Sequence, residues 1–195
     1  VFHLNPLQEA VQPEGDTNFA GLAEKIGTIA RALAPCPVVV KEVGAGISPA
    51  DARLLVDQGV RVIDVAGSGG TSWSRIEHHR QEEGGADIGL LFQDWGIPTP
   101  VALMDLAPLR PGVTLIASGG IRSGIDMAKS LVLGASLAGL ASPFLRPAME
   151  SADAVRTVIR RLRREFTTAL FLLGATTVAD VFGREDLIRC SPWKK

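Results

Sequence analysis

Five times along the chain, a short apolar segment runs directly into polar or glycine-rich residues. The clearest case is the segment at residues 113–117, which leads into the string SGGIR at residues 118–122. A strand that runs into glycines and a cation is a common setting for a bound phosphate. The pattern therefore predicts a cofactor or substrate that carries a phosphate. The other segments end at residues 3–5, 41–42, 64–71 and 139–142.

Residues with helical spacing separate these apolar segments. Apolar side chains recur at Leu22, Ile26, Ile29 and Leu33, as on one face of a helix. The string SPAD at residues 48–51 combines a capping serine with a proline in the first turn, which predicts a helix start. Such alternation is typical of parallel strands joined by right-handed crossovers. We predict strands at 38–40, 60–65, 113–117 and 137–140, and further helices at 125–133 and 155–173.

A parallel sheet of this size fits either an open doubly wound fold or part of a closed barrel. An open sheet gathers its ligand residues at one switch point, whereas every strand of a (β/α)8 barrel contributes them. Because all five segments end in such residues, we predict an α/β fold that is part of a TIM (β/α)8 barrel. The chain opens without methionine on what resembles a strand end. We therefore expect residues 1–195 to form a single, N-terminally truncated barrel domain.

The composition argues against several classes of function. A net charge of −1 offers no electrostatic case for binding nucleic acid or an anionic membrane, and the arginines at residues 156–164 fall on the polar side of the last helix. No apolar run is long enough to span a membrane. Cys36 and Cys190 lack the spacing of metal ligands. We expect reduced thiols in a cytoplasmic protein.

Four polar side chains follow the first apolar segment: His3, Asn5, Gln8 and Glu9. One interpretation is an ordinary loop in which Asn5 and a proline start a helix. The other is an anion or metal site, since His and Asn donate to phosphate oxygens and Mg²⁺ is held by one or two carboxylates together with phosphates and water. The residues alone leave both interpretations open.

Lys41 leaves a buried strand and therefore needs a partner for its charge. The first possibility is a salt bridge with Glu42 or with Asp64 on the next strand. The second is that the ammonium group reaches toward a bound cofactor. Spacing does not decide between them.

A second glycine-rich turn, GSGGTS at residues 67–72, follows Asp64. Glycines let the backbone approach a ligand closely, and Thr71 adds a hydroxyl donor. The turn matches neither the P-loop nor the dinucleotide fingerprint. Together with Gly119 and Gly120, it suggests a ligand that lies across several strand ends. We predict that His78 and His79 form a solvated helix end, and that residues 82–86 (EEGGA) form a mobile loop.

With these residues together, the chain closely resembles the FMN-dependent type 2 isopentenyl diphosphate isomerases. The resemblance spans nearly the whole chain, and it corresponds to the second half of such an enzyme, from the end of the fourth barrel strand through the eighth. The matching strings are HLNPLQE (3–9), KEVGAGIS (41–48), DVAGSGGTSW (64–73), DWGIPT (94–99), IASGGIRSG (116–124) and GLASPFL (139–145).

The resemblance implies a role for individual residues. Gln8 would act as the catalytic residue beside the reacting alkene, and Glu9 would bind Mg²⁺. His3 and Asn5, with Gln8, would hold the diphosphate substrate. Ala66 departs from relatives that place a serine hydroxyl there, which removes at most one hydrogen bond to the flavin. The implied FMN-binding residues are Lys41, Thr71, Gly119, Gly120, Ile121, Arg122, Leu140 and Ala141.

The reaction implied is the allylic shift between isopentenyl and dimethylallyl diphosphate in isoprenoid biosynthesis. An unactivated alkene is a poor base, and reduced FMN suits its protonation. The cofactors implied are FMN, Mg²⁺ and NADPH (or NADH), the last only to reduce the flavin. The full-length enzyme would be a homo-oligomer, a tetramer or octamer. Since the implied N-terminal half supplies further contacts, we expect this chain alone to be poorly soluble or inactive.

Two alternatives remain from the sequence. An FMN-dependent 2-hydroxy-acid oxidase or dehydrogenase would share the Gly119–Gly120 site, but such enzymes carry a histidine–glycine–glycine–arginine string. Here the corresponding string is Ser68-Gly69-Gly70-Thr71, which lacks the histidine. The other alternative is an inactive fragment that binds flavin or nothing.

Overall fold

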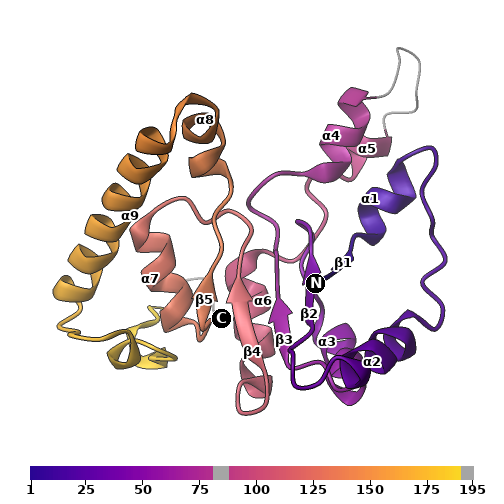
Figure 1. Cartoon of the computed structure of the whole chain (residues 1–195), viewed down its shortest axis with the longest axis horizontal. Helices are drawn as coiled ribbons and strands as arrows, with labels where there is room; N and C mark the ends of the chain where they lie inside the picture. Colours follow the sequence, from indigo (N-terminus) through magenta and orange to yellow (C-terminus); the bar gives the residue numbers. More distant parts are fainter. Residues whose placement is uncertain (81–87, 190–195) are drawn as a thin grey trace.

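The computed structural model describes residues 1–80 and 88–189, so the predicted loop at 82–86 and Cys190 lie outside the described residues. Its centre is a five-stranded parallel sheet, shown in Figure 1. The strands follow one another across the sheet in chain order, without a reversal. A doubly wound sheet needs a reversal at its switch point, so this order confirms the predicted partial barrel. The strands are β1 (Phe2–Leu4), β2 (Val39–Glu42), β3 (Val62–Asp64), β4 (Thr114–Ala117) and β5 (Leu137–Ala138).

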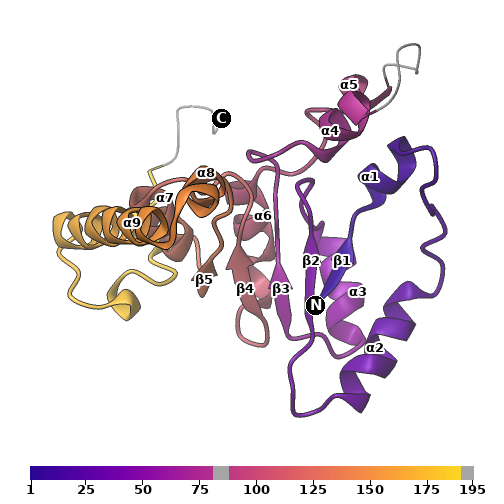
Figure 2. The same cartoon turned by 45° about the horizontal axis from the view of Figure 1, so that its top comes forward.

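Helices α3 and α6 cover one face of the sheet, and α7 lies beside β5 (Figure 2). Three shorter helices, α1, α4 and α5, stand beyond the carboxyl ends of the strands (Figure 1). Helices α8 and α9 pack on each other, and α9 packs on α7. The helices are α1 (Pro6–Val11), α2 (Leu22–Ala32), α3 (Pro49–Asp57), α4 (Trp73–Arg80), α5 (Ile88–Leu91), α6 (Thr99–Leu106), α7 (Gly124–Val132), α8 (Ser142–Glu150) and α9 (Ala152–Leu172), with 3₁₀ turns at Ala107–Leu109, Val178–Asp180 and Glu185–Leu187.

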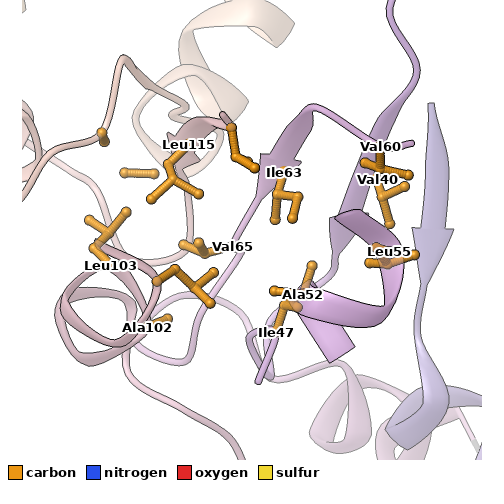
Figure 3. Packing of buried hydrophobic residues seen from close by; sticks show 14 of the residues in the cluster. Val40, Ile47, Ala52, Leu55, Val60, Ile63, Val65, Ala102, Leu103 and Leu115 are labelled. Carbon is orange, nitrogen blue, oxygen red and sulfur yellow. The ribbon is translucent and has the colours of Figure 1, made fainter. Parts of the chain in front are cut away.

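The main core lies between the sheet and these helices (Figure 3). Val40, Ile63 and Leu115 are fully buried and stand side by side on neighbouring strands. Successive side chains of a strand point to opposite faces. The next residues along these strands, Lys41, Asp64 and Ile116, therefore share the other face, which is the face that a barrel turns toward its axis.

Each predicted strand or helix begins within three residues of the observed one. The side chain of Ser48 accepts a hydrogen bond from the amide of Asp51, which confirms the predicted start of α3. Strand β3 is shorter than predicted because Ala66 adopts a φ of 36°, which turns the chain away two residues after Asp64. Helix α8 carries prolines at residues 143 and 147, and the sequence pattern did not predict it.

The predicted apolar face of α9 is only partly buried. Leu162 and Leu170 are buried, but Ile159 is 51% exposed and Leu173 is 42% exposed, because α7 and α8 cover only part of the helix. The arginines of α9 are exposed, as predicted. In α4, His79 is exposed as predicted, whereas His78 is half-buried. Within the described residues, no helix combines the length and apolar character needed to cross a membrane.

Candidate functional site

A cavity of about 660 Å³ opens at the carboxyl ends of the strands. This is the edge at which barrel enzymes place their active sites, and the volume suits a cofactor-sized ligand. Every residue predicted to bind the cofactor lines it, together with His3 and Gln8. The strand ends thus bring together residues far apart in sequence. These cofactor residues are Lys41, Thr71, Gly119, Gly120, Ile121, Arg122, Leu140 and Ala141.

Lys41 stands between His3 and Asp64 in the register of the sheet. Its ammonium nitrogen donates to the backbone carbonyl of Glu42 at 2.6 Å. Among the ion pairs of the described residues, none joins Lys41 to Glu42 or to Asp64. The possible salt bridges of Lys41 with Glu42 and with Asp64 are therefore not formed, and the ammonium group remains at the cavity wall without a carboxylate partner in the part of the chain described.

The carboxylate of Glu42 serves the loop that follows it. One of its oxygens accepts hydrogen bonds from the amides of Val43, Gly44, Ala45 and Gly46, at 2.5–3.2 Å. Burial raises the pKa of Glu42 above its ordinary value, while these four amides oppose the shift by favouring the charged form. Val43 and Gly44 line the cavity, so Glu42 fixes the conformation of part of the cavity wall through its hydrogen bonds to their amides.

Asp64 is buried at the end of β3 and is tied to the neighbouring strand. Its Oδ1 accepts from the hydroxyl of Ser118 at 2.7 Å and from the amide of Ala66 at 3.2 Å. Asp64, Ala66 and Ser118 all line the cavity. The sequence named Asp64 only as a possible partner of Lys41 and did not identify Ser118. No local pattern pairs residues that lie 54 positions apart.

The two glycine-rich loops pack directly against each other. A Cβ atom at Gly119 would overlap the carbonyl oxygen of Gly67, and one at Gly120 would lie 2.7 Å from the carbonyl oxygen of Gly69. Both residues also have positive φ angles, 89° and 81°. Glycine is required at both positions, since any side chain would push the loops apart. The guanidinium of Arg122 joins the loops by donating to the carbonyls of Gly69 and Gly120.

The backbone of this region fits a phosphate. Within the described residues, neither the amide of Gly119 nor that of Gly120 donates a hydrogen bond to the protein. Such paired free amides on adjacent glycines, beside a cation, form the kind of cradle in which phosphate oxygens bind. The residues present therefore fit the phosphate group of FMN.

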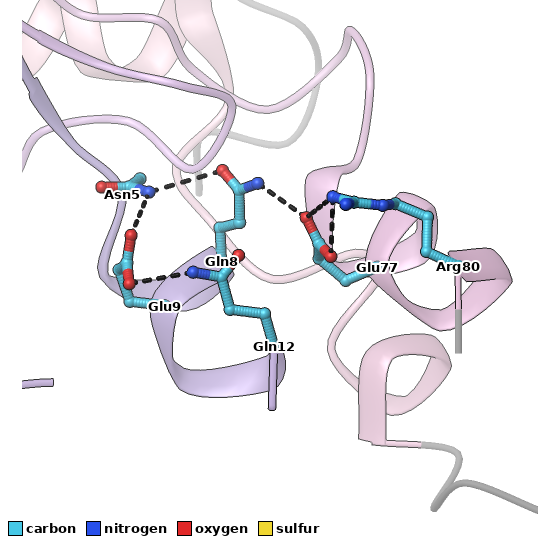
Figure 4. A network of polar contacts seen from close by, with 6 residues as sticks. All are labelled: Asn5, Gln8, Glu9, Gln12, Glu77 and Arg80. Carbon is cyan, nitrogen blue, oxygen red and sulfur yellow. Dashed lines mark hydrogen bonds and ion pairs between the residues drawn. The ribbon is translucent and has the colours of Figure 1, made fainter. Parts of the chain in front are cut away.

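Gln8 links the cavity to a polar network drawn in Figure 4. Its side-chain nitrogen donates to the carboxylate of Glu77 at 2.7 Å, and its oxygen lies 3.4 Å from the donating nitrogen of Asn5. Glu77 is 4% exposed and also receives the guanidinium of Arg80 at 3.2 Å. The two bonds orient the Gln8 amide. Glu77 was not predicted as a site residue, because its burial in α4 is visible only in the structure.

Asn5 and Glu9 also belong to this network (Figure 4), but they are not among the residues that line the cavity. The carboxylate of Glu9 accepts from the side chains of Asn5 and Gln12 and from the amide of Asp16, and these bonds, led by that of Asp16, lower its pKa. Glu9 is therefore ionised near neutral pH, as a Mg²⁺ ligand must be. No group of three or more potential metal-ligating side chains occurs within residues 1–80 and 88–189. A metal here would depend on substrate phosphates and water for its other ligands.

A second cavity of about 480 Å³ adjoins the first. The two share Gln8, Thr71 and Trp73 as lining residues. Arg75, Asp94 and Trp95 complete one side of the second cavity. Gln8 thus stands between two spaces, one with phosphate-binding chemistry and one with aromatic walls.

Comparisons with known proteins agree with this geometry. Residues 20–189 match the model of the FMN-dependent dehydrogenase family. Proteins named isopentenyl-diphosphate delta-isomerase from Hydrogenovibrio crunogenus and Paracoccus zeaxanthinifaciens are 53% and 54% identical to this chain, over 95% and 96% of its length and 54% of theirs. The predicted resemblance is confirmed. The chain spans about half the length of the curated relatives it matches.

Solved structures of flavin enzymes share the fold. A mandelate oxidase with benzoyl-formic acid superposes with a TM-score of 0.55 at 27% identity, covering 83% of this chain and 42% of the other. A lactate oxidase from Pediococcus acidilactici superposes with a TM-score of 0.59 at 26% identity, covering 87% and 40%.

Proposed function

Because this chain belongs to the FMN-dependent dehydrogenase family, we propose that it carries the FMN site of an enzyme that isomerises isopentenyl diphosphate to dimethylallyl diphosphate. One observation carries the proposal: the residues that the isomerase resemblance assigns to FMN line a single cavity at the carboxyl ends of the strands, together with His3 and Gln8. The names of the relatives support the same reaction.

The proposed binding roles follow from the chemistry of the lining. The free amides of Gly119 and Gly120, with Arg122, would hold the FMN phosphate. Lys41 and Thr71 would contact the flavin, as would Ile121, Leu140 and Ala141. His3 and Asn5 would bind the substrate diphosphate, whose negative charge Mg²⁺ on Glu9 would offset.

The isomerisation needs a proton added at one end of an allylic unit and removed from the other. Reduced FMN, when bound, would supply the acid–base chemistry and an electron-rich face for the developing positive charge. Gln8 would orient the alkene, because its own amide is held by Glu77 and Asn5.

Further features of the whole enzyme belong to this proposal. The reaction is redox-neutral, so NADPH or NADH would serve only to reduce the flavin at the start. The cytoplasmic setting, the tetrameric or octameric homo-oligomer and the single barrel domain are also proposed. Since the curated relatives are about twice as long, we propose that this chain alone is inactive.

The likeness to mandelate and lactate oxidases favours a second candidate, the oxidation of a 2-hydroxy acid. Against it, the turn after β3 contains Ser68 and Thr71 where a histidine and an arginine would be needed to act on such a substrate. In the test, the chain is mixed with the N-terminal half of a curated relative and given isopentenyl diphosphate under anaerobic reducing conditions, and separately lactate or mandelate in air. Dimethylallyl diphosphate as the product supports the isomerase, whereas hydrogen peroxide from the hydroxy acid supports the oxidase.

A further inference from the structure

Thr99, the first residue of α6, lies beneath the loop that follows β4. It is 3% exposed and is not among the residues that line the cavity. Its hydroxyl oxygen lies 2.9 Å from the carbonyl oxygen of Ser118 and 2.7 Å from that of Gly119. The single hydrogen of this buried hydroxyl is therefore shared between the carbonyls of two successive peptide groups of the loop.

Because the peptide bond is planar, the orientation of each carbonyl also fixes the orientation of the N–H group of the next residue. In a trans peptide the carbonyl oxygen and the N–H of the next residue point in opposite directions. When Thr99 holds the carbonyls of Ser118 and Gly119, the N–H groups of Gly119 and Gly120 must point to the far side of the loop. Gly119 and Gly120 line the cavity, and their amides are free of acceptors among the described residues.

The two carbonyls do not depend on Thr99 equally. The carbonyl of Ser118 also accepts from the amide of Gly67 at 3.2 Å. The carbonyl of Gly119 has Thr99 as its partner, and no other donor to it occurs in the part of the chain described. The peptide that joins Gly119 to Gly120 lies between two glycines and is therefore easy to rotate. The Thr99 hydroxyl is the group that selects its orientation.

We propose that Thr99 is a positioning residue for phosphate recognition: its hydroxyl fixes the Gly119–Gly120 peptide so that the two free amides face the FMN phosphate. The inference deepens the proposed function and rests on it, since it takes FMN to be the ligand of this cavity. Thr99 acts through the loop and makes no contact with the ligand itself.

The test compares two flavins that differ only in the phosphate. FMN and riboflavin are titrated into the wild-type chain, Thr99→Val and Thr99→Ser, with flavin fluorescence as the readout. Valine has nearly the shape of threonine but lacks the donor, whereas serine keeps it. We expect Thr99→Val to weaken FMN binding about tenfold or more, because the amide of Gly120 would no longer be held toward the charged phosphate. Riboflavin has no phosphate, so its binding should weaken less than about twofold. Thr99→Ser should retain the wild-type ratio of the two affinities.

The matched control is Ser130→Ala, which removes another buried hydroxyl that donates to a carbonyl, in α7 and away from the cavity. It should leave both affinities unchanged. If Thr99→Val weakens both flavins equally, or neither, the positioning role is wrong while FMN binding by the wild type still supports the proposed function. If the wild-type chain binds neither flavin, the proposed function and this inference are overturned together.

Discussion

The side-chain amide of Gln8 donates a 2.7 Å hydrogen bond to the carboxylate of Glu77, a residue 69 positions further along the chain. The bond joins α1 to α4 above the carboxyl ends of the strands, as Figure 4 shows. The carboxylate of Glu77 accepts hydrogen bonds but does not donate them, so the NH₂ group of the Gln8 amide faces Glu77. The oxygen of Gln8 is thereby left to the side of Asn5.

Replacing Glu77 by glutamine should impair turnover without impairing flavin binding. Glu77→Gln removes the charge that strengthens the bond to Gln8 and allows the amide to rotate, so we expect kcat to fall about 5- to 10-fold in the assembled enzyme. The dissociation constant of FMN should change less than about twofold. Steady-state kinetics and a fluorescence titration measure the two quantities.

The control is Arg80→Ala, which removes the exposed partner of Glu77 and leaves the bond to Gln8 in place. The Arg80 side chain is largely exposed and Glu77 keeps its bond to Gln8, so kcat should remain within about twofold of wild type. Equal losses in both variants would show that Glu77 maintains the structure of α4 and does not orient Gln8.

Lys41→Met tests whether the ammonium group of Lys41 contributes to FMN binding. Since Lys41 has no carboxylate partner in the described part of the chain, loss of its charge should not lower the free energy of unfolding. FMN affinity should fall about tenfold or more, because a charge at the cavity wall is removed. Lys129→Met, at an exposed position of α7, is the matched control. Lost stability with unchanged FMN affinity would favour a structural role.

Gly119→Ala should disrupt the contact between the two glycine loops. The new methyl group would overlap the carbonyl of Gly67, and alanine is disfavoured at a φ of 89°. We expect a loss of about 2 kcal/mol or more in the free energy of unfolding by urea, together with loss of FMN binding. Gly112→Ala, where the methyl group meets nothing within 4 Å, should be nearly neutral. A stable Gly119→Ala variant that binds FMN normally would contradict the loop packing.

Glu42 should make stability depend on pH. Burial raises the pKa of its carboxyl in the folded state above the ordinary value of 4.5, so the folded chain binds a proton more tightly than the unfolded chain. The stabilising contribution is therefore fully present below about pH 4.5 and is lost as the pH rises through the folded pKa. Urea unfolding of wild type and Glu42→Gln between pH 4 and pH 8 measures it.

The difference in stability, wild type minus Glu42→Gln, should become more favourable to wild type as the pH is lowered. Glu14→Gln, at an exposed position, should show a constant difference from wild type. A constant difference for Glu42→Gln as well would mean that the four amides cancel the effect of burial.

Local patterns were sufficient to predict the alternating strands and helices and the strand ends that border the cavity, whereas the individual FMN-binding residues were predicted from the family resemblance. The strand ends at Lys41 and Gly119 are visible in sequence because apolar runs stop there and polar or glycine residues begin. The capping serine of α3 likewise predicts its own helix start. These features depend on neighbouring residues, so they need no knowledge of the fold.

The supporting contacts could not be predicted in the same way. Glu77, Thr99 and Ser118 act on residues that are distant in sequence, and nothing nearby marks their partners. The possible salt bridge of Lys41 with Glu42 is not formed: the ammonium group of Lys41 donates to the backbone carbonyl of Glu42, while four amides of the following turn bind one oxygen of the Glu42 carboxylate. The conformation of the loop decides which donors lie within hydrogen-bond distance of a buried carboxylate, and the sequence does not show that conformation.

We propose that this chain carries the flavin half of an isopentenyl diphosphate isomerase site. The most direct measurement is conversion of isopentenyl to dimethylallyl diphosphate with FMN, Mg²⁺ and NADPH, for the chain alone and mixed with the N-terminal half of the Paracoccus zeaxanthinifaciens relative. We predict turnover only in the mixture, and its loss in Gln8→Ala. A mixture that binds FMN but forms no dimethylallyl diphosphate would contradict the claim.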